Sequence, residues 1–279
     1  MKKITDKIIE KFRKYLIDEE KSVATLEKYI RDIRAFRVWL GGEQLCKAKV
    51  MEYKEYLIGS YAPASVNSIL SSLNSFFDYN NEYGLKVKTL RIQKQIFAKD
   101  EKELTKAEYD RLLTAAKAEG NQKLYLLMQT ICATGIRVSE LKYVTLEAIK
   151  SGRADVNMKG KLRVIIIPKD LCKMLKKYAY EQRITSGSIF VTKTGRPLDR
   201  TNIWKLMKSL CESAGVDKAK VFPHNLRHLF ARTFYSIEKD IVRLADILGH
   251  SSVNTTRIYT METLNICRNQ VQRLGLLRC

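Results

Sequence analysis

Hydrophobic residues recur at helical spacing along the first 85 residues of the chain, in four stripes separated by polar positions. Each stripe predicts an amphipathic helix. Gly41 and Gly42 end the second helix and Pro63 begins the fourth, because glycine terminates helices and proline fits their first turn. The pattern predicts a bundle with an aromatic core, made of four helices over residues 6–20, 22–40, 47–58 and 63–84.

The pattern changes over residues 86–103, which read KVKTLRIQKQIFAKDEKE. This stretch is basic and has no clear helical stripe. It also contains no Gly or Ser, which argues against a floppy tether. We interpret it as an extended basic linker between a first domain, residues 1–85, and a second domain, residues 104–279.

The helical pattern returns after the linker and is interrupted by a short change of period. Thr105 and Glu108 form a capping box that opens a helix, and the next apolar run ends at Gly135. β-Branched residues on both sides of Lys-Gly-Lys predict a β-hairpin over residues 154–167. A short strand is expected over residues 188–191, and further helices over 169–182, 199–214, 224–234 and 241–248. The predicted fold class is mainly α, with a small β-hairpin in the second domain (α+β).

Charge changes this picture more than composition does. The 279 residues are 45% hydrophobic and 29% charged, as in an ordinary globular protein, but 51 Lys and Arg against 30 Asp and Glu leave a net charge of +21. Residues 1–90 carry +4 (16 minus 12) and the rest +17 (35 minus 18). Such a surplus favours a polyanion as partner, with nucleic acid the leading candidate. Charge alone does not exclude a merely basic protein.

Several other partner classes find no support in the sequence. The chain has no long apolar run, signal peptide or lipidation pattern, so we expect a cytoplasmic protein without a membrane partner. Its six cysteines are scattered, without a Cys-x-x-Cys pair, and indicate reduced thiols instead of disulfides or a metal site. No phosphate-binding loop pattern for a nucleotide is present.

The candidate chemistry gathers in one stretch, which holds all three histidines of the chain. His224 and Arg227 lie one helical turn apart, so both can address one ligand. His250 follows an apolar helical run at a Gly-His turn, and Tyr259 comes nine residues later. Guanidinium binds phosphate oxygens bidentately, imidazole moves protons and a phenol can act as a nucleophile. The combination is typical of a site that handles a phosphate.

A further arginine stands upstream of this stretch. Gly135 fits the left-handed end of a helix and would direct Arg137 away from the core, where Glu140 can brace it. On its own this is an ordinary Arg–Glu surface pair. Tyr259 on its own is an amphipathic tyrosine on a helix. Only the combination of motifs favours a catalytic interpretation.

Four short motifs stand in order in the chain, and they read ATGIRVSEL at 133–141, HNLRH at 224–228, LGHSS at 248–252 and TTRIYT at 255–260. Together they resemble the active-site blocks of the tyrosine site-specific recombinases, the phage integrase family. Each motif alone is weak evidence, but four in the right order over about half of the chain form a specific signal. The layout is closest to Xer-type recombinases and to small mobile-element integrases.

The resemblance implies a reaction and a set of residues. Members of this family cut, exchange and rejoin DNA strands through a covalent 3′-phosphotyrosyl intermediate, and Tyr259 matches their nucleophile. A phenol is a poor nucleophile near neutral pH, so a base is needed, and His224 is our candidate. Two or three cationic donors would offset the charge that gathers on the phosphate in the transition state, and we assign this to Arg137, Arg227 and His250.

The hairpin carries the last candidate. The resemblance places a catalytic lysine on such a hairpin, where it would protonate the leaving 5′ oxygen. Lys159 matches it best and Lys161 is the reserve, although the spacing to Pro168 departs from the family pattern. His228 is interpreted as structural. The reaction needs no metal and no nucleotide, so we expect no cofactor.

The resemblance also implies partners. We expect double-stranded DNA with an inverted-repeat site, and a homotetramer on two such sites, with the first domain as a core-binding module. The segment after Tyr259 packs on its own chain or docks on a neighbouring copy. One alternative is a type IB topoisomerase-like enzyme, which the N-terminal bundle and the His-x-x-Arg histidine disfavour. The other is a DNA-binding relative that has lost catalysis.

Overall fold

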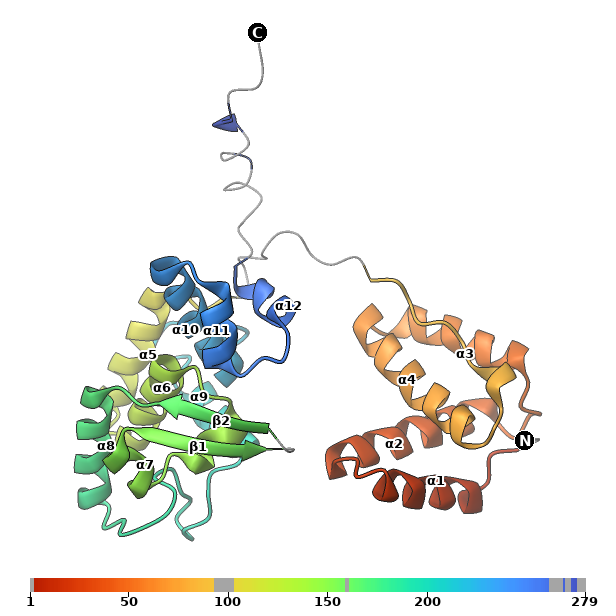
Figure 1. Ribbon diagram of the computed structural model, residues 1–279, viewed down its shortest axis with the longest axis horizontal. Helices are drawn as coiled ribbons and strands as arrows, with labels where there is room; N and C mark the ends of the chain where they lie inside the picture. The colour runs from red at the N-terminus through yellow and green to blue at the C-terminus, as the bar shows by residue number, and fades with distance from the viewer. Residues whose placement is uncertain (1–2, 93–102, 159–160, 261–267, 269–271, 275–279) are drawn as a thin grey trace. The chain divides into compact units, whose positions relative to one another are not determined.

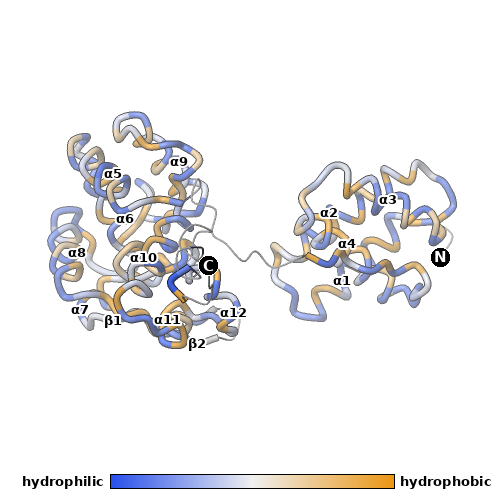
Figure 2. The backbone as a smooth tube through the Cα atoms, turned by 90° about the horizontal axis from the view of Figure 1, so that it is seen from above, coloured by the Kyte–Doolittle hydropathy of each residue, from blue (hydrophilic) through white to orange (hydrophobic). Residues whose placement is uncertain are grey.

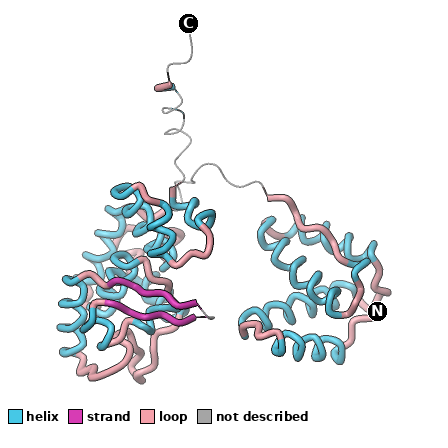
Figure 3. The backbone as a smooth tube through the Cα atoms, viewed as in Figure 1, coloured by secondary structure: helices cyan, strands magenta, loops and turns pink. Residues whose placement is uncertain are grey.

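The computed structural model describes residues 3–92, 103–158, 161–260, 268 and 272–274. It divides into two compact units, Met1–Lys94 and Gln95–Cys279 (Figure 1). Helices dominate both units, and the described residues form one two-stranded antiparallel sheet (Figure 3). The predicted fold class is therefore confirmed. Most of the expected linker (93–102) and most of the segment after Tyr259 lie outside the described residues.

The first unit is a helical bundle with an aromatic core. Its elements are α1 (Asp6–Asp18), α2 (Val23–Leu40), α3 (Lys47–Ser60), α4 (Pro63–Tyr79) and the 3-10 turn η1 (Tyr83–Leu85). Phe12 and Phe76 meet edge to face in the core, with ring centroids 5.3 Å apart. The fourth helix ends before the predicted Gly84, because the chain leaves the helical conformation at Asn81, where φ is 58°.

The second unit packs its helices around α6, which is buried along most of its length. Hydrophobic and hydrophilic positions alternate along the helices of both units, as the amphipathic stripes predicted (Figure 2). The elements are α5 (Lys106–Ala118), α6 (Gln122–Thr134), η3 (Val138–Tyr143), α7 (Leu146–Ser151), β1 (Arg153–Met158), β2 (Lys161–Ile166), α8 (Lys169–Glu181), α9 (Arg200–Ser209), α10 (Pro223–Glu238), α11 (Ile241–Leu248), α12 (Val253–Thr256) and η4 (Arg257–Tyr259).

Three sequence-based predictions in this unit are wrong: one strand and the ends of two helices. The expected strand over residues 188–191 does not form, because Ser188 and Val191 each make only an isolated bridge, to different partners. The helix expected to reach residue 214 ends at Ser209, where three-residue turns replace the α-helical hydrogen bonds. The helix expected to end at residue 234 continues to Glu238 and stops at Lys239, whose φ is 53°.

No helix within the described residues has both the length and the apolar composition needed to cross a bilayer.

Gly135 lies where the end of α6 meets α10 and α11. Its φ is +61°, and a Cβ there would lie 2.5 Å from the Phe230 ring and 3.0 Å from Leu248. The backbone of the segment that leads to Arg137 therefore approaches two other helices at a distance that only glycine permits.

Gly135→Ala should destabilise the protein strongly, and Gly120→Ala serves as its matched control. Gly120 has a similar φ of +65°, but a Cβ there would meet nothing within 4 Å. Both variants incur the strain of a left-handed alanine, about 1 kcal/mol. Gly135→Ala should lose roughly 2 kcal/mol more, because it overpacks the core. Urea unfolding measures both, and equal losses would show that the contact with Phe230 is unimportant.

Candidate active site

Helix α10 brings three of the functional side chains to one face. Pro223 occupies its first turn, and His224, Arg227 and His228 follow at spacings of three and four residues, so they project from the same side. The rings of His224 and His228 meet edge to face, with centroids 4.6 Å apart. Arg227 is only 2% exposed. A guanidinium buried to this degree must be hydrogen-bonded within the protein.

Arg227 ties together segments that are far apart in the sequence. Its Nη1 donates to the carbonyl of Gly135, two residues before Arg137. Its Nη2 donates to the carbonyl of Leu248 at 2.7 Å and lies 3.0 Å from Nε2 of His250. One guanidinium therefore holds the end of α6 and the end of α11 together, and with them two of the four sequence motifs.

Arg137 also reaches this turn. Its Nη2 donates to the carbonyl of Gly249 at 3.0 Å, and its Nη1 donates to Oε1 of Glu140 at 2.8 Å. The backbone N–H of Arg137 also donates to Glu140, whose carboxylate is 3% exposed. The brace expected from Glu140 is thus present, and it is a buried carboxylate instead of an exposed surface partner.

The contacts of His250 define its tautomer. Arginine has no hydrogen-bond acceptor, so Nε2 of His250 must accept from Nη2 of Arg227. A neutral ring then carries its proton on Nδ1, which lies 2.8 Å from Oγ1 of Thr256 and donates to it. Thr256 is fully buried and precedes the turn that carries Tyr259. In this arrangement Nε2 of His250 can donate to a phosphate only after Arg227 releases it and the nitrogen gains a proton.

Tyr259 is buried beside the histidines. It lies in η4, is 4% exposed and packs in a small apolar cluster with Ala231, Leu244 and Leu248. Its ring meets that of His228 edge to face at 4.6 Å and lies nearly parallel to that of His250 at 6.1 Å. Its hydroxyl lies near the Arg227 guanidinium, where it partly offsets the fall in the pKa of Arg227. The ring neighbour of His224 is His228, which stands between His224 and the tyrosine.

Burial and repulsion between cations shift the site's ionisation. Burial first, and then repulsion by Arg137, lowers the pKa of Arg227 to about 10, against a partial rise caused by Tyr259. Burial and the arginine charges lower the pKa of His250 to about 4. Burial, His224 and Arg227 lower the pKa of His228 to about 4. The pKa of His224 falls for the same reasons, burial first and then Arg227.

Positive charge at neutral pH therefore resides on the arginines, and the imidazoles are neutral. The sequence analysis assigned His250 as one of two or three cationic donors. In the DNA-free protein its burial beside Arg227, Arg137 and Arg163 makes it a neutral group instead, because charging it would add a fourth positive charge near the other three.

The structure does not describe every predicted site residue. Lys159 lies outside the described residues, and so does the side chain of Lys161, although its backbone opens β2. Arg163, two residues further along β2, was not predicted as a site residue, yet its Nη1 donates to the Leu248 carbonyl. The sequence carried no signal for it, because alternation with the apolar Leu162 and Val164 favours an outward arginine, whereas in the structure these two residues are the exposed ones.

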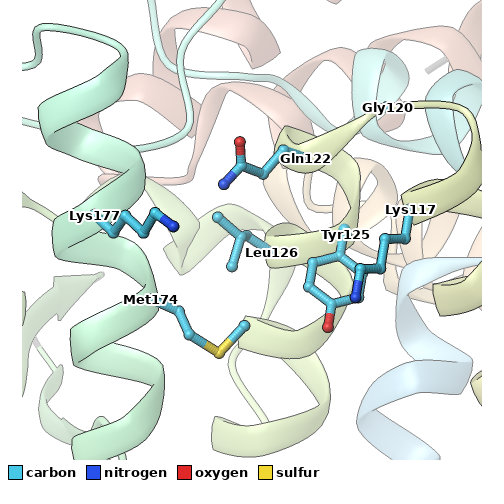
Figure 4. A pocket seen from close by; sticks show the side chains of 7 residues that line it. All are labelled: Lys117, Gly120, Gln122, Tyr125, Leu126, Met174 and Lys177. Atoms are coloured by element: carbon cyan, nitrogen blue, oxygen red, sulfur yellow. The ribbon is translucent and has the colours of Figure 1, made fainter.

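A separate hollow lies on another part of the second unit. Figure 4 shows side chains from α6 and α8 facing one another across it. It is lined by Lys117, Gly120, Gln122, Tyr125, Leu126, Met174 and Lys177. None of the five described residues assigned to catalysis from the sequence belongs to this lining.

Known protein families match both parts of the chain. A model of the phage integrase family matches residues 102–265, and a model of the phage integrase N-terminal SAM-like domain matches residues 9–82. Tyrosine recombinase XerA of Thermococcus kodakarensis is 27% identical, over 98% of this chain and 96% of its own. Tyrosine recombinase XerD of Vibrio cholerae is 27% identical, over 85% of each chain.

Solved structures share the fold. XerH recombinase bound to a palindromic difH substrate superposes with a TM-score of 0.74 at 19% identity, over 94% of this chain and 83% of its own. A lambda integrase dimer bound to a COC′ core site superposes with a TM-score of 0.72 at 20% identity, over 91% and 94%.

Proposed function

The chain belongs to the phage integrase family of tyrosine recombinases, which cleave and rejoin DNA, and on this premise we propose that Tyr259 is the residue that attacks the DNA backbone. The function is site-specific recombination. One observation supports Tyr259 most strongly. The tyrosine is buried with its ring against His228 and beside His250, next to Arg227, the guanidinium that also holds the turn to which Arg137 is bonded.

The arginines supply a binding site for one phosphodiester. Arg137 and Arg227 both donate to carbonyls of the Leu248–Gly249 turn, so their guanidinium groups are held close together despite their like charge. A phosphate bound between them would relieve that repulsion, and its non-bridging oxygens would accept from both. Because negative charge accumulates on those oxygens in the transition state, donors held in advance lower the barrier without having to reorganise.

Tyr259 loses its proton as it forms the new bond. Its oxygen attacks phosphorus, the bond from phosphorus to the 5′ oxygen breaks, and the 3′ phosphate stays on the tyrosine. His224 is the proposed acceptor of the phenolic proton, because its lowered pKa leaves the ring neutral at pH 7. In the DNA-free protein the His228 ring lies between the two, so this transfer requires the site to rearrange when DNA binds. Lys159 donates a proton to the departing 5′ oxygen. The tyrosyl ester keeps the bond energy, so attack by a 5′ hydroxyl of another strand rejoins the DNA.

Double-stranded DNA is the partner that the charge of the chain fits. A net charge of +21 can release many counterions from a duplex. We propose that two copies bind an inverted-repeat site, and that two such sites come together in a homotetramer. The XerH and lambda integrase structures are themselves bound to DNA substrates, as are those of the Tn1549 integrase.

Strand exchange is favoured over the alternatives. The N-terminal unit matches the SAM-like domain model of integrases, which a topoisomerase-like reading of the chain leaves unexplained. A relative that only binds DNA would not need a buried tyrosine beside a buried arginine and two histidines.

The test uses a nicked suicide duplex that carries the inverted repeats flanking the gene. Wild-type protein should form an adduct stable in detergent, and mass spectrometry should find the nucleotide on the peptide that contains Tyr259. The same protein should resolve a Holliday junction built from two such sites. An adduct without junction products would favour the topoisomerase-like activity, and the absence of both would favour a protein that only binds DNA.

A further inference from the structure

Arg163 has a largely buried side chain in a hairpin whose outer face is exposed. Along β2 the side chains alternate, so Leu162 and Val164 face outward while Arg163 and Ile165 face inward. The side chain of Arg163 is 9% exposed, against 64% for Arg153 on β1 of the same hairpin. Burial of a guanidinium is costly and needs compensating partners.

Its partners are two acceptors that the phosphate-binding arginines also use. Nη1 of Arg163 donates to the carbonyl of Leu248 at 2.5 Å, and Arg227 donates to the same oxygen. The same Nη1 lies 3.3 Å from Oε2 of Glu140, the carboxylate that accepts from Arg137. Arg163 thereby connects to Arg227 through one shared acceptor and to Arg137 through the other.

The aliphatic part of Arg163 packs against the backbone of the same turn. A Cβ on Gly249 would lie 2.4 Å from Cδ of Arg163, so the side chain lies flat on a backbone that only glycine leaves uncovered. Gly249 also offers its carbonyl to Arg137 and is followed by His250. The turn is therefore held by three arginines together, Arg163, Arg137 and Arg227.

Stability alone does not explain this arginine. Nε and Nη2 of Arg163 are buried and have no hydrogen-bond partner among the described residues. Unpartnered buried N–H groups destabilise a fold, and an apolar side chain of similar length would avoid that penalty. Among its nitrogens only Nη1 makes hydrogen bonds to described residues, and its acceptors are the Leu248 carbonyl in the turn and the Glu140 carboxylate.

We propose that Arg163 is a positioning residue for DNA cleavage. It sets the Leu248–Gly249–His250 turn and Glu140, and through them His250 and Arg137, in the arrangement that phosphate transfer needs, without touching DNA itself. This inference rests on the proposed function. It predicts that loss of Arg163 slows the chemical step, while DNA affinity and fold stability stay near those of the wild type.

The test compares Arg163→Met, Arg163→Lys and the control Arg153→Met on the suicide duplex, at saturating protein. Arg163→Met should cleave roughly 10- to 100-fold more slowly, as when a partner that orients an active-site group is removed. Its DNA Kd should stay within about threefold of wild type and its melting temperature should not fall. Arg163→Lys should recover part of the rate, because one donor can still reach the Leu248 carbonyl. Arg153→Met should behave as wild type.

Each outcome decides the proposal. A wild-type cleavage rate for Arg163→Met overturns it, and so does weaker binding with an unchanged rate at saturation, which would make Arg163 a DNA contact. If Arg163→Met does not fold, Arg163→Gln decides: a folded variant with a reduced rate supports the proposal and one with the wild-type rate overturns it. Failure of the wild-type protein to form any adduct defeats the proposed function instead, so the two failures are distinguishable.

Discussion

Tyr259→Phe should abolish the covalent adduct on the suicide duplex, at least about 10³-fold below wild type, since loss of a nucleophile removes the reaction path itself. The substitution deletes one oxygen and keeps a ring that packs against His228 and His250. Tyr259 is 4% exposed, so the phenylalanine remains in an apolar cluster that suits it. We therefore expect the variant to fold and to bind DNA within about twofold of wild type. Gel electrophoresis in detergent, beside a mobility-shift titration, measures both quantities.

Tyr235→Phe is the matched control. Tyr235 packs on the same apolar cluster and also loses only a hydroxyl, but it contacts neither Arg227 nor the histidines in the described structure. It should form the adduct at the wild-type rate. An adduct that persists in Tyr259→Phe would place the nucleophile elsewhere and would contradict the reaction proposed for this site.

Arg227→Lys should reduce the cleavage rate about 10²- to 10³-fold although the positive charge remains. Arg227 uses two nitrogens to reach the Gly135 carbonyl, the Leu248 carbonyl and Nε2 of His250. A lysine places a single nitrogen at the end of a flexible stem and cannot serve these groups together. The variant should also lose stability, on the order of 1–3 kcal/mol, because a buried carbonyl loses its donor. Single-turnover cleavage and urea unfolding give the two numbers.

Arg243→Lys is the matched control for Arg227→Lys. Arg243 is exposed on α11, the helix that leads into the Gly-His turn, and the substitution keeps its charge. This variant should match wild type in cleavage and in stability. If Arg227→Lys also cleaves at the wild-type rate, then a point charge at this position suffices and the geometry described here has no catalytic role.

Much of the fold could be predicted from the sequence because helices are local structures. Apolar spacing located all four helices of the first unit, and the capping box at Thr105 is present as expected. The errors occurred where local signals are weak. Residues 188–191 have the composition of a strand, but a strand needs a neighbouring strand, and only single residues lie opposite.

In the candidate site, too, the contacts between residues close in sequence could be predicted, and those between distant residues could not. Spacing along one helix already placed His224 and Arg227 on a common face, and Arg137 three residues from Glu140. The motifs and the charge of the chain likewise pointed to phosphate chemistry on DNA. These are contacts or properties that a short stretch of sequence determines by itself.

Only the tertiary structure decided how those stretches meet. Arg227 bonds to a carbonyl 92 residues away, Arg137 to one 112 residues away and Arg163 to one 85 residues away. The same packing keeps His250 neutral, with its proton on Nδ1. It also places the ring of His228, and not that of His224, against Tyr259. Contacts at such separations depend on which helix faces pack together and how closely glycines let their backbones approach. No local pattern of residues specifies either.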